Sequence, residues 1–338
     1  MKESENVSLF IASFYEKKFL KLYFSYFREE INSTQGFMKK LSITILFFLL
    51  AFCQINAQQA KYVFYFIGDG MGVNQVQGTE LYLGELEGKI GITPLQFTQF
   101  PYTTVATTFS ATNGVTDSAA AGTALATGNK TKNGAIGVLK DLQTPVYSVA
   151  TWAKERGCRV GVATSVSVDH ATPAAFYAHA SGRGSYYEIG KDLYETGFDF
   201  YAGSDFLQPQ DKKNPQAANL YSLADQYGYT IARGYKDYLK KSKKADKMIL
   251  FQPEAASKSD RSSIPYAIDR GKSDLTLQEI TRSAINFLSK DLSKGFFLMV
   301  EGSQLDDYGH FNDIDLLMQE THDFDRTIGR IFEWAAQD

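Results

Sequence analysis

The sequence predicts an α/β fold in which helices cover both faces of a mostly parallel central sheet. Three short runs rich in β-branched and aromatic residues, at 61–67, 159–164 and 296–300, have the pattern of buried strands. Helical patterns occur between them, at 118–126, 146–156 and 275–289. Strands that alternate with helices are typical of parallel sheets in three-layer α/β proteins.

Each predicted element carries a local signal. The run KYVFYFI at 61–67 is broken by a glycine-rich turn at 68–72, which ends the first strand. The helix at 118–126 consists almost wholly of small residues, and the helix at 275–289 has Thr276 and Glu279 at the spacing of a capping box. Residues 202–265 are more polar and less periodic, with a lysine cluster at 240–244. We expect them to form an excursion over the surface.

The composition excludes several classes of protein. Apolar residues make up 44% of the 338 residues and charged residues 22%, which allows a sizeable core and excludes intrinsic disorder. The net charge of −3 provides no basic field, so we expect no nucleic-acid-binding surface. Only two cysteines occur, so a metal site would be built from Asp, Glu, His and hydroxyl side chains.

Residues 38–57 have the pattern of a secretory signal peptide. Two lysines follow Met38, an apolar run extends from 41 to 53, and Ala57 is the expected cleavage point. Because the run is shorter than the ~20 residues that span a bilayer, we expect no stable membrane span after cleavage. The protein would then be exported, to the periplasm or the extracellular space. A buried core helix and a lipoprotein signal ending at Cys53 are the alternatives.

Residues 1–37 precede this signal, although signal peptides begin at the N-terminus. We therefore expect 1–37 to be an extension that results from a start assigned too early, with Met38 as the true first residue. The alternative is a membrane-associating arm. Residues 58–338 are expected to form one domain.

Polar side chains suited to cations follow each predicted strand. The carboxyl ends of parallel strands share one edge of the sheet, where ligands collect. Glu301 directly follows an apolar run, and a buried carboxylate without a partner is costly. Asp306 and His310 have a spacing that can bring both groups to one cation. For any one of these residues taken alone, the alternative is that it forms a turn, caps a helix or is an ordinary polar residue of the surface. The candidate ligands are Asp69, His170, Thr172, Glu301, Asp306 and His310.

The segment TDSAAAGTA at 116–124 places Ser118 at the start of the helix of small residues. The backbone N–H groups and the dipole at a helix N-terminus favour an anion there, such as a phosphate bound to the serine oxygen. The alternative is that Asp117 or Ser118 only caps the helix. Arg183 offers a bidentate fork for phosphate, although alone it would be an ordinary surface arginine.

From about residue 61 to its end, the chain resembles the alkaline phosphatases. The resemblance rests on four motifs in order: GDGMG at 68–72, TDSAA at 116–120, ATP at 171–173 with Arg183, and EGSQLDDYGH at 301–310. It implies an alkaline-phosphatase-like three-layer sandwich. It also implies a phosphate monoester hydrolase that acts through a phosphoserine at a site with two Zn²⁺ ions and one Mg²⁺ ion. Small phosphomonoesters would be the substrates, and homodimers are common among similar proteins.

The resemblance implies roles for the residues around the serine. Ser118 would be the nucleophile and a zinc ligand. Arg183 would hold the phosphate oxygens, and Asp69 would bridge a zinc ion and the magnesium ion.

The remaining roles concern the cations alone. By the same resemblance, Thr172 and Glu301 would also bind magnesium. His170 falls near the magnesium, at a place where some members have Asp and others His. Asp306 and His310 would bind the other zinc.

The family pattern continues beyond the last residue printed here, with an Asp-His pair and a further His that ligate zinc. We therefore expect two half-built zinc sites, a nearly complete magnesium group and a sheet that is incomplete on its C-terminal side. The alternative function is a truncated, inactive family member that binds magnesium or phosphate without turnover.

Overall fold

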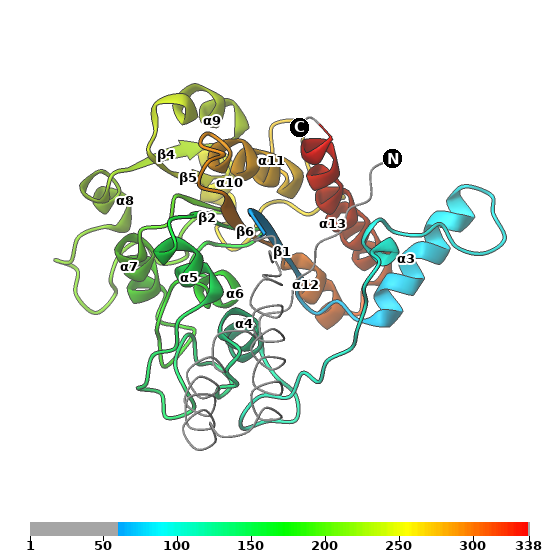
Figure 1. Ribbon diagram of the computed structural model, residues 1–338, viewed down its shortest axis with the longest axis horizontal. Coiled ribbons are helices and arrows are strands. Elements are labelled where there is room, and N and C mark those ends of the chain that lie inside the picture. The colour runs from blue at the N-terminus through cyan, green and yellow to red at the C-terminus, as the bar shows by residue number, and fades with distance from the viewer. Residues whose placement is uncertain (1–59, 337–338) are drawn as a thin grey trace, which may run out of the picture. The chain divides into compact units, whose positions relative to one another are not determined.

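The centre of the molecule is a six-stranded sheet in which every neighbouring pair of strands is parallel. A computed structural model describes residues 60–336, and the strand order is β1-β6-β2-β3-β5-β4 (Figure 1). The parallel sheet confirms the predicted fold class. The strands are β1 (Tyr62–Gly68), β2 (Arg159–Thr164), β3 (Phe200–Gly203), β4 (Tyr229–Arg233), β5 (Lys247–Phe251) and β6 (Phe296–Gly302).

The strands form because their apolar side chains are buried on both faces of the sheet. All seven residues of β6 are buried. Phe296 and Leu298 belong to the core on one face, whereas Phe297 and Met299 belong to the core on the other. This alternation follows from the two-residue period of a strand. A strand that is apolar at every position is therefore typical of a sheet covered on both sides.

Helices provide the two outer layers. Helices α4 to α8 pack on one face, and α9 and α11 to α13 pack on the other (Figure 1). The α-helices are α3 (Val73–Leu86), α4 (Ser118–Thr127), α5 (Val149–Glu155), α6 (Ala171–Ala174), α7 (Tyr186–Thr196), α8 (Leu220–Leu223), α9 (Tyr235–Lys241), α10 (Glu254–Ser259), α11 (Leu277–Leu288), α12 (Gln304–Phe311) and α13 (Ile314–Ala335). Short 3₁₀ turns occur at η1 (Phe97–Gln99), η2 (Asp225–Tyr227) and η3 (Ser242–Lys244).

The three predicted strands and three predicted helices are all present, with small shifts at their ends. The capping box is formed, because the Glu279 N–H donates to Thr276 Oγ1 at 3.0 Å and the Thr276 N–H donates to Glu279 Oε2 at 3.2 Å. Helix α5 begins at Val149 rather than at residue 146. Ser148 is its N-cap, and its hydroxyl oxygen accepts from the Thr151 N–H at 3.1 Å.

The prediction for residues 202–265 was wrong. Instead of an excursion over the surface, this region supplies β4 and β5, which complete one side of the sheet. Met248, Ile249, Leu250 and Phe251 are all fully buried. The apolar segment at 247–251 is short and follows the lysine cluster, so its strand pattern is concealed by the polar residues around it.

The sequence predicts an N-terminal extension, a signal peptide and the absence of a stable membrane span after cleavage. The predicted extension at 1–37 and the predicted signal peptide at 38–57 lie outside the described residues. Within the described part of the chain, no helix is long and apolar enough to cross a membrane.

Candidate catalytic and metal-binding site

The site lies where β1, β2 and β6 end side by side. The register pairs Glu301 of β6 with Ile67 of β1 and with Thr164 of β2. Asp69 follows β1 directly, and its N–H donates to the Gly302 carbonyl at 3.1 Å. The parallel register therefore places two carboxylates, one from each of two adjacent strands, at the same edge of the sheet.

Glu301 is completely buried beside a second acid. Its Oε2 accepts from the Thr164 hydroxyl at 2.5 Å. Burial, together with the nearby charge of Asp69, raises the pKa of the Glu301 carboxyl to about 8, although the Thr164 hydroxyl acts against this shift. Two carboxylates in a buried place repel each other when both are ionised. A cation between them would remove that cost.

Four buried polar atoms around these carboxylates have no hydrogen-bond partner. An orphaned buried polar atom costs free energy, so its presence calls for an explanation. Three of the four are oxygens, the ligand type that Mg²⁺ prefers. The residues therefore fit a hard divalent cation. The four atoms are Asp69 Oδ2, His170 Nδ1, Thr172 Oγ1 and Glu301 Oε1.

The carboxylate and imidazole side chains at this place are too few to form a cation site without a ligand of another type. Among residues 60–336, no three His, Cys, Asp or Glu side chains come together as a group that could hold a metal. The additional ligand would be the hydroxyl of Thr172, which belongs to the short helix α6. Helix α4 approaches α6 closely because Gly122 lacks a side chain: a Cβ there would lie 3.2 Å from the Cβ of Ala175 and 3.4 Å from the Cα of Thr172.

Ser118 is the first residue of α4 and lies next to Asp69. Burial and the charge of Asp306 raise the pKa of Asp69, and the nearby Ser118 side chain acts against this shift. The sequence prediction that Ser118 opens this helix is confirmed. The serine hydroxyl, the helix N-terminus and a half-buried carboxylate are thus in one place, an arrangement that suits a nucleophile acting on an anionic substrate.

Asp117 has two functions in the structure. It is the N-cap of α4, with its Oδ1 accepting from the Ala120 N–H at 3.0 Å. Its Oδ2 accepts from the Gly134 N–H at 3.0 Å and pairs with Arg183 Nη1 at 3.3 Å. The capping role was foreseen as an alternative, whereas the pairing with Arg183 was missed. The two residues are far apart in the sequence, so no local pattern indicates their contact.

His170 contacts the other arm of Arg183. The distance between Arg183 Nη2 and His170 Nε2 is 3.2 Å. Burial, and the charge of Arg183, lower the pKa of His170 to about 4, so its ring is neutral near pH 7. A neutral imidazole has one nitrogen with a free lone pair. His170 can therefore accept from Arg183 or ligate a cation through its other nitrogen, but not both, and its predicted role as a metal ligand stays a prediction.

Asp306 and His310 lie one helical turn apart on α12. His310 Nε2 is 3.3 Å from Asp306 Oδ2, and the His310 side chain is 76% exposed. Gly70 has φ +67°, and a Cβ at this position would lie 2.5 Å from Asp306 Oδ1. A glycine is therefore needed for Asp306 to approach the loop that carries Asp69. The predicted pair is formed, and it is close to the other acids.

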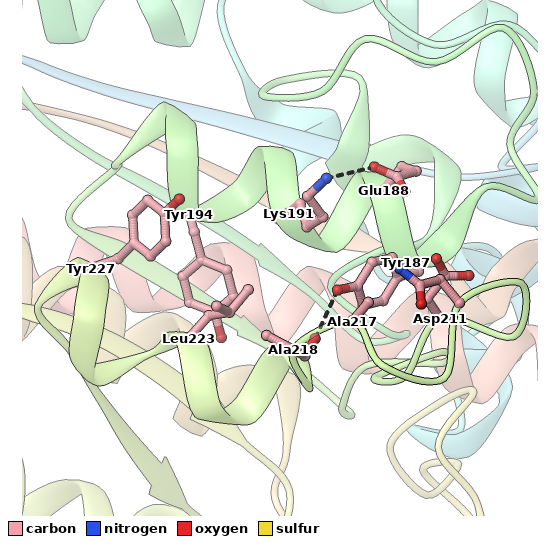
Figure 2. Close-up of a pocket in the computed structure, with 10 residues that line it drawn as sticks. Tyr187, Glu188, Lys191, Tyr194, Asp211, Ala217, Ala218, Leu223 and Tyr227 are labelled. Atoms are coloured by element: carbon pink, nitrogen blue, oxygen red, sulfur yellow. Dashed lines mark hydrogen bonds and ion pairs between the residues drawn. The ribbon is translucent and has the colours of Figure 1, made fainter.

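A separate pocket of about 370 Å³ lies between α7 and α8 (Figure 2). Tyr194 and Tyr227 are at one end, and Tyr187 at the other donates to the Ala218 carbonyl at 2.7 Å. None of the predicted site residues lines this pocket.

Comparison with known proteins identifies related sequences. A family model described as alkaline phosphatase matches residues 60–197 and 204–338. Alkaline phosphatase 3 of Bacillus subtilis (strain 168) is 34% identical over 287 residues, which cover 84% of this chain and 59% of that protein. Alkaline phosphatase 4 of Drosophila melanogaster is 31% identical over 323 residues, which cover 80% of this chain and 53% of that protein. The chain thus spans less than two thirds of the length of these relatives.

Solved structures with the same fold are also related in sequence. The alkaline phosphatase of the Antarctic bacterium TAB5 has a TM-score of 0.71 and 34% identity, over 82% of this chain and 76% of that one. Two variants of the TAB5 enzyme, with one histidine replaced by glutamate or by aspartate, have Mg bound in the M3 site. The fold, the match over most of the sequence and the relatives above 30% identity lead to one conclusion: the chain belongs to the alkaline phosphatase family.

Proposed function

We propose that this protein hydrolyses phosphate monoesters and that Ser118 is the nucleophile. The observation that carries the proposal is the position of Ser118 at the N-terminus of α4, where its side chain is near enough to Asp69 to lower the pKa of that carboxyl, and Asp69 has an orphaned buried oxygen. Family membership supports the same reaction. The substrates would be small phosphomonoesters.

The chain's own residues account for most of the reaction. The Ser118 oxygen attacks phosphorus and displaces the alcohol of the ester, which leaves with a proton, and a phosphoserine remains. Arg183 binds the phosphate oxygens, and the N–H groups at the start of α4 face the same charge. Water then cleaves the Ser118–phosphorus bond and releases phosphate. Two easier displacements thus replace one difficult displacement.

Bound cations would supply what these residues lack. In the proposal, Asp69, Thr172 and Glu301 would hold Mg²⁺, Asp69 and Ser118 would hold one Zn²⁺, and Asp306 and His310 would contribute ligands to a second Zn²⁺. When bound, the cations lower the pKa of the serine hydroxyl and stabilise the charge on the leaving oxygen. The orphaned oxygens of Asp69, Thr172 and Glu301 support the magnesium assignment.

A second candidate is cation or phosphate binding without turnover. Zinc normally has about four ligands. In the described part of the chain, Asp306 is paired with the exposed His310, and no third His, Cys, Asp or Glu joins them in a group that could hold a metal ion. The lack of a third ligand among the described side chains favours the second candidate, binding without turnover, at the position proposed for this zinc ion. Export to the periplasm or the extracellular space and assembly as a homodimer are further proposals, based on residues 38–57 and on the family respectively.

The test is the hydrolysis of p-nitrophenyl phosphate by the full chain, with Zn²⁺ and Mg²⁺ added, above pH 8. This pH ensures that Glu301, with its raised pKa of about 8, is ionised and can bind a cation. We expect turnover by the unaltered protein and its loss, by a factor of at least about 1,000, in Ser118→Ala. Equal rates would refute the role of Ser118. Bound cations without turnover in either protein would establish the second candidate.

A further inference from the structure

Thr164 lies beside the proposed magnesium ligands and is not one of them. It is the last residue of β2 and is fully buried. The strand register places it directly next to Glu301 of β6. A buried hydroxyl is costly unless it makes a hydrogen bond, so the partners of the Thr164 hydroxyl show what this polar side chain does in the core.

The hydrogen bonds of the Thr164 hydroxyl have a fixed direction. Its Oγ1 accepts from the Val166 N–H at 3.1 Å and donates to Glu301 Oε2 at 2.5 Å. A threonine hydroxyl has a single hydrogen, and a backbone N–H can only donate. The contact with Val166 therefore uses a lone pair of Oγ1, and the hydrogen is left for the Glu301 carboxylate.

The backbone around Glu301 is held by the residue that follows β2. The Ser165 N–H donates to the Glu301 carbonyl at 3.1 Å, and the Ser303 N–H donates to Ser165 Oγ at 2.9 Å. The freedom that remains to Glu301 is rotation about its side-chain bonds. The hydrogen bond from Thr164 restricts that rotation.

The two carboxylate oxygens of Glu301 therefore have different roles. Oε2 accepts from Thr164, whereas Oε1 is one of the orphaned buried oxygens. Because a carboxylate is rigid and planar, a contact that holds Oε2 also limits the position of Oε1. The other orphaned oxygens of this site belong to Asp69 and Thr172. Thr164 thus binds one oxygen of Glu301 and leaves the other for a cation.

We propose that Thr164 is a positioning residue, which holds Glu301 Oε2 so that Oε1 is available to a bound Mg²⁺ ion. The inference rests on the proposed function, in which Glu301 holds Mg²⁺ together with Asp69 and Thr172. Thr164 acts through Glu301 and is not itself a ligand, since Glu301 and Val166 occupy its hydroxyl. A group that fixes the orientation of a ligand raises the affinity for the metal, because the ligand is already ordered when the ion binds.

The experiment measures Mg²⁺ affinity of the full chain by calorimetry, above pH 8, so that Glu301, with its pKa of about 8, is mostly ionised. Thr164→Val removes the hydroxyl and keeps the branched shape, and Thr164→Ser keeps the hydroxyl. Thr164→Cys, whose thiol is a weak donor, is the second test in case Thr164→Val does not fold. Glu301→Gln removes the charge of the proposed ligand.

The matched control is Thr327→Val. Thr327 is also a fully buried threonine, and its hydroxyl donates to the Asp323 carbonyl at 2.8 Å on α13. The thermal unfolding midpoint of each variant is measured without the cation, so that a loss of stability is distinguished from a loss of Mg²⁺ binding.

We expect Thr164→Val to weaken Mg²⁺ binding by about 10- to 100-fold, as loss of a residue that orients a metal ligand does. Thr164→Cys should weaken it less, and Thr164→Ser, which keeps the donor, should retain most of the affinity. Glu301→Gln should weaken binding at least as much as Thr164→Val, because it removes a charged ligand. Thr327→Val should bind Mg²⁺ normally, whatever its effect on the unfolding midpoint.

The outcomes separate this inference from the proposed function. If the unaltered protein binds no Mg²⁺, or if Glu301→Gln binds it equally well, the magnesium assignment and the inference fall together. If Glu301→Gln weakens binding but neither Thr164→Val nor Thr164→Cys does, the inference alone is overturned. It is also overturned if Thr164→Ser binds as weakly as Thr164→Val, or if Thr327→Val weakens binding to the same extent. The role of Ser118 is tested separately, because equal hydrolysis rates in the unaltered protein and Ser118→Ala would refute it at any Mg²⁺ affinity.

Discussion

At the scale of single residues, Asp117 shows how much a side chain can do beyond its local pattern. As the residue before Ser118, it is a good N-cap, and the sequence suffices to predict that role. Its second oxygen holds Arg183, the residue proposed to bind phosphate, at 3.3 Å. One carboxylate thus sets both the start of the helix that carries the nucleophile and the direction of the phosphate-binding guanidinium.

Replacing Asp117 with asparagine should separate these two roles. Asparagine is also a good N-cap, so the thermal unfolding midpoint should change little. The charge-assisted contact with Arg183 is lost, however, and we expect inorganic phosphate to inhibit about tenfold less tightly, which corresponds to roughly 1.4 kcal/mol. The measurement is the inhibition constant of phosphate in the monoester assay. An unchanged constant would show that Arg183 needs no support from Asp117.

The residues also show where sequence reasoning succeeds and where it stops. Ser118, Asp69 and Glu301 could be predicted because each lies at a helix start or a strand exit, and parallel strands end at one edge. The contact between Asp117 and Arg183, and that between Thr164 and Glu301, join residues 66 and 137 positions apart. Such contacts depend on tertiary packing, which short patterns do not report.

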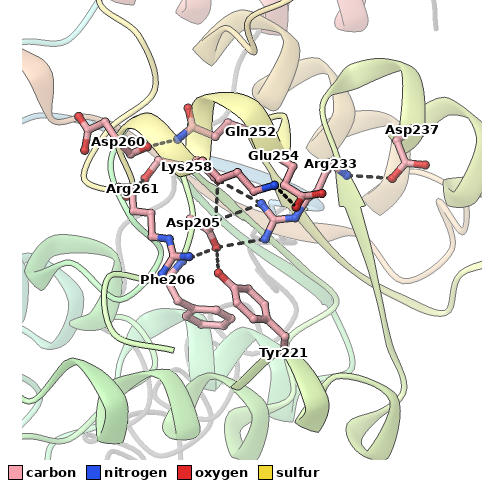
Figure 3. A network of polar contacts seen from close by, with 12 residues as sticks. Asp205, Phe206, Tyr221, Arg233, Asp237, Gln252, Glu254, Lys258, Asp260 and Arg261 are labelled. Atoms are coloured by element: carbon pink, nitrogen blue, oxygen red, sulfur yellow. Dashed lines mark hydrogen bonds and ion pairs between the residues drawn. The ribbon is translucent and has the colours of Figure 1, made fainter. Parts of the chain in front are cut away.

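At the scale of elements, a buried polar network explains why residues 202–265 belong to the sheet. Asp205, which follows β3, is fully buried and receives hydrogen bonds from three elements (Figure 3). Tyr221 of α8 and Ser257 of α10 each donate to it at 2.5 Å, and Arg233 at the end of β4 pairs with it at 3.0 Å. The network links the ends of β3 and β4, which lie on either side of β5 in the sheet. Its members are far apart in a polar stretch, so the stretch alone indicates only surface.

Removing the cation of this network should destabilise the fold. Arg233→Met leaves Asp205 buried without its charged partner, and breaking such a pair costs about 3–5 kcal/mol. Chemical denaturation should show this loss in the free energy of unfolding. The control is Lys258→Met, which removes a highly exposed partner of Glu254 and should have little effect. A loss of stability no larger in Arg233→Met than in the control would contradict the role given to the network.

At the scale of the whole molecule, the parallel sheet gathers the chemistry of the chain at one edge. Alternation of strands and helices was sufficient to predict the fold class, because a strand that is apolar on both faces requires helices on both sides. The strands β3, β4 and β5 were not foreseen, since strands of four or five residues carry little periodic signal. The position of α12 could not be predicted either, because its contacts are distant in the sequence: Gln304 donates to the Ile264 carbonyl, 40 positions away.

The central step of the proposed reaction is the transfer of the phosphoryl group from the substrate to the Ser118 oxygen. The most direct measurement incubates the full chain with Zn²⁺, Mg²⁺ and a phosphate monoester, quenches it in acid and maps the peptides by mass spectrometry. We predict a single phosphoryl group on Ser118, absent from Ser118→Ala and absent when a chelator removes the cations. A phosphoryl group on a different side chain, or hydrolysis that leaves Ser118 unlabelled throughout, would contradict the account.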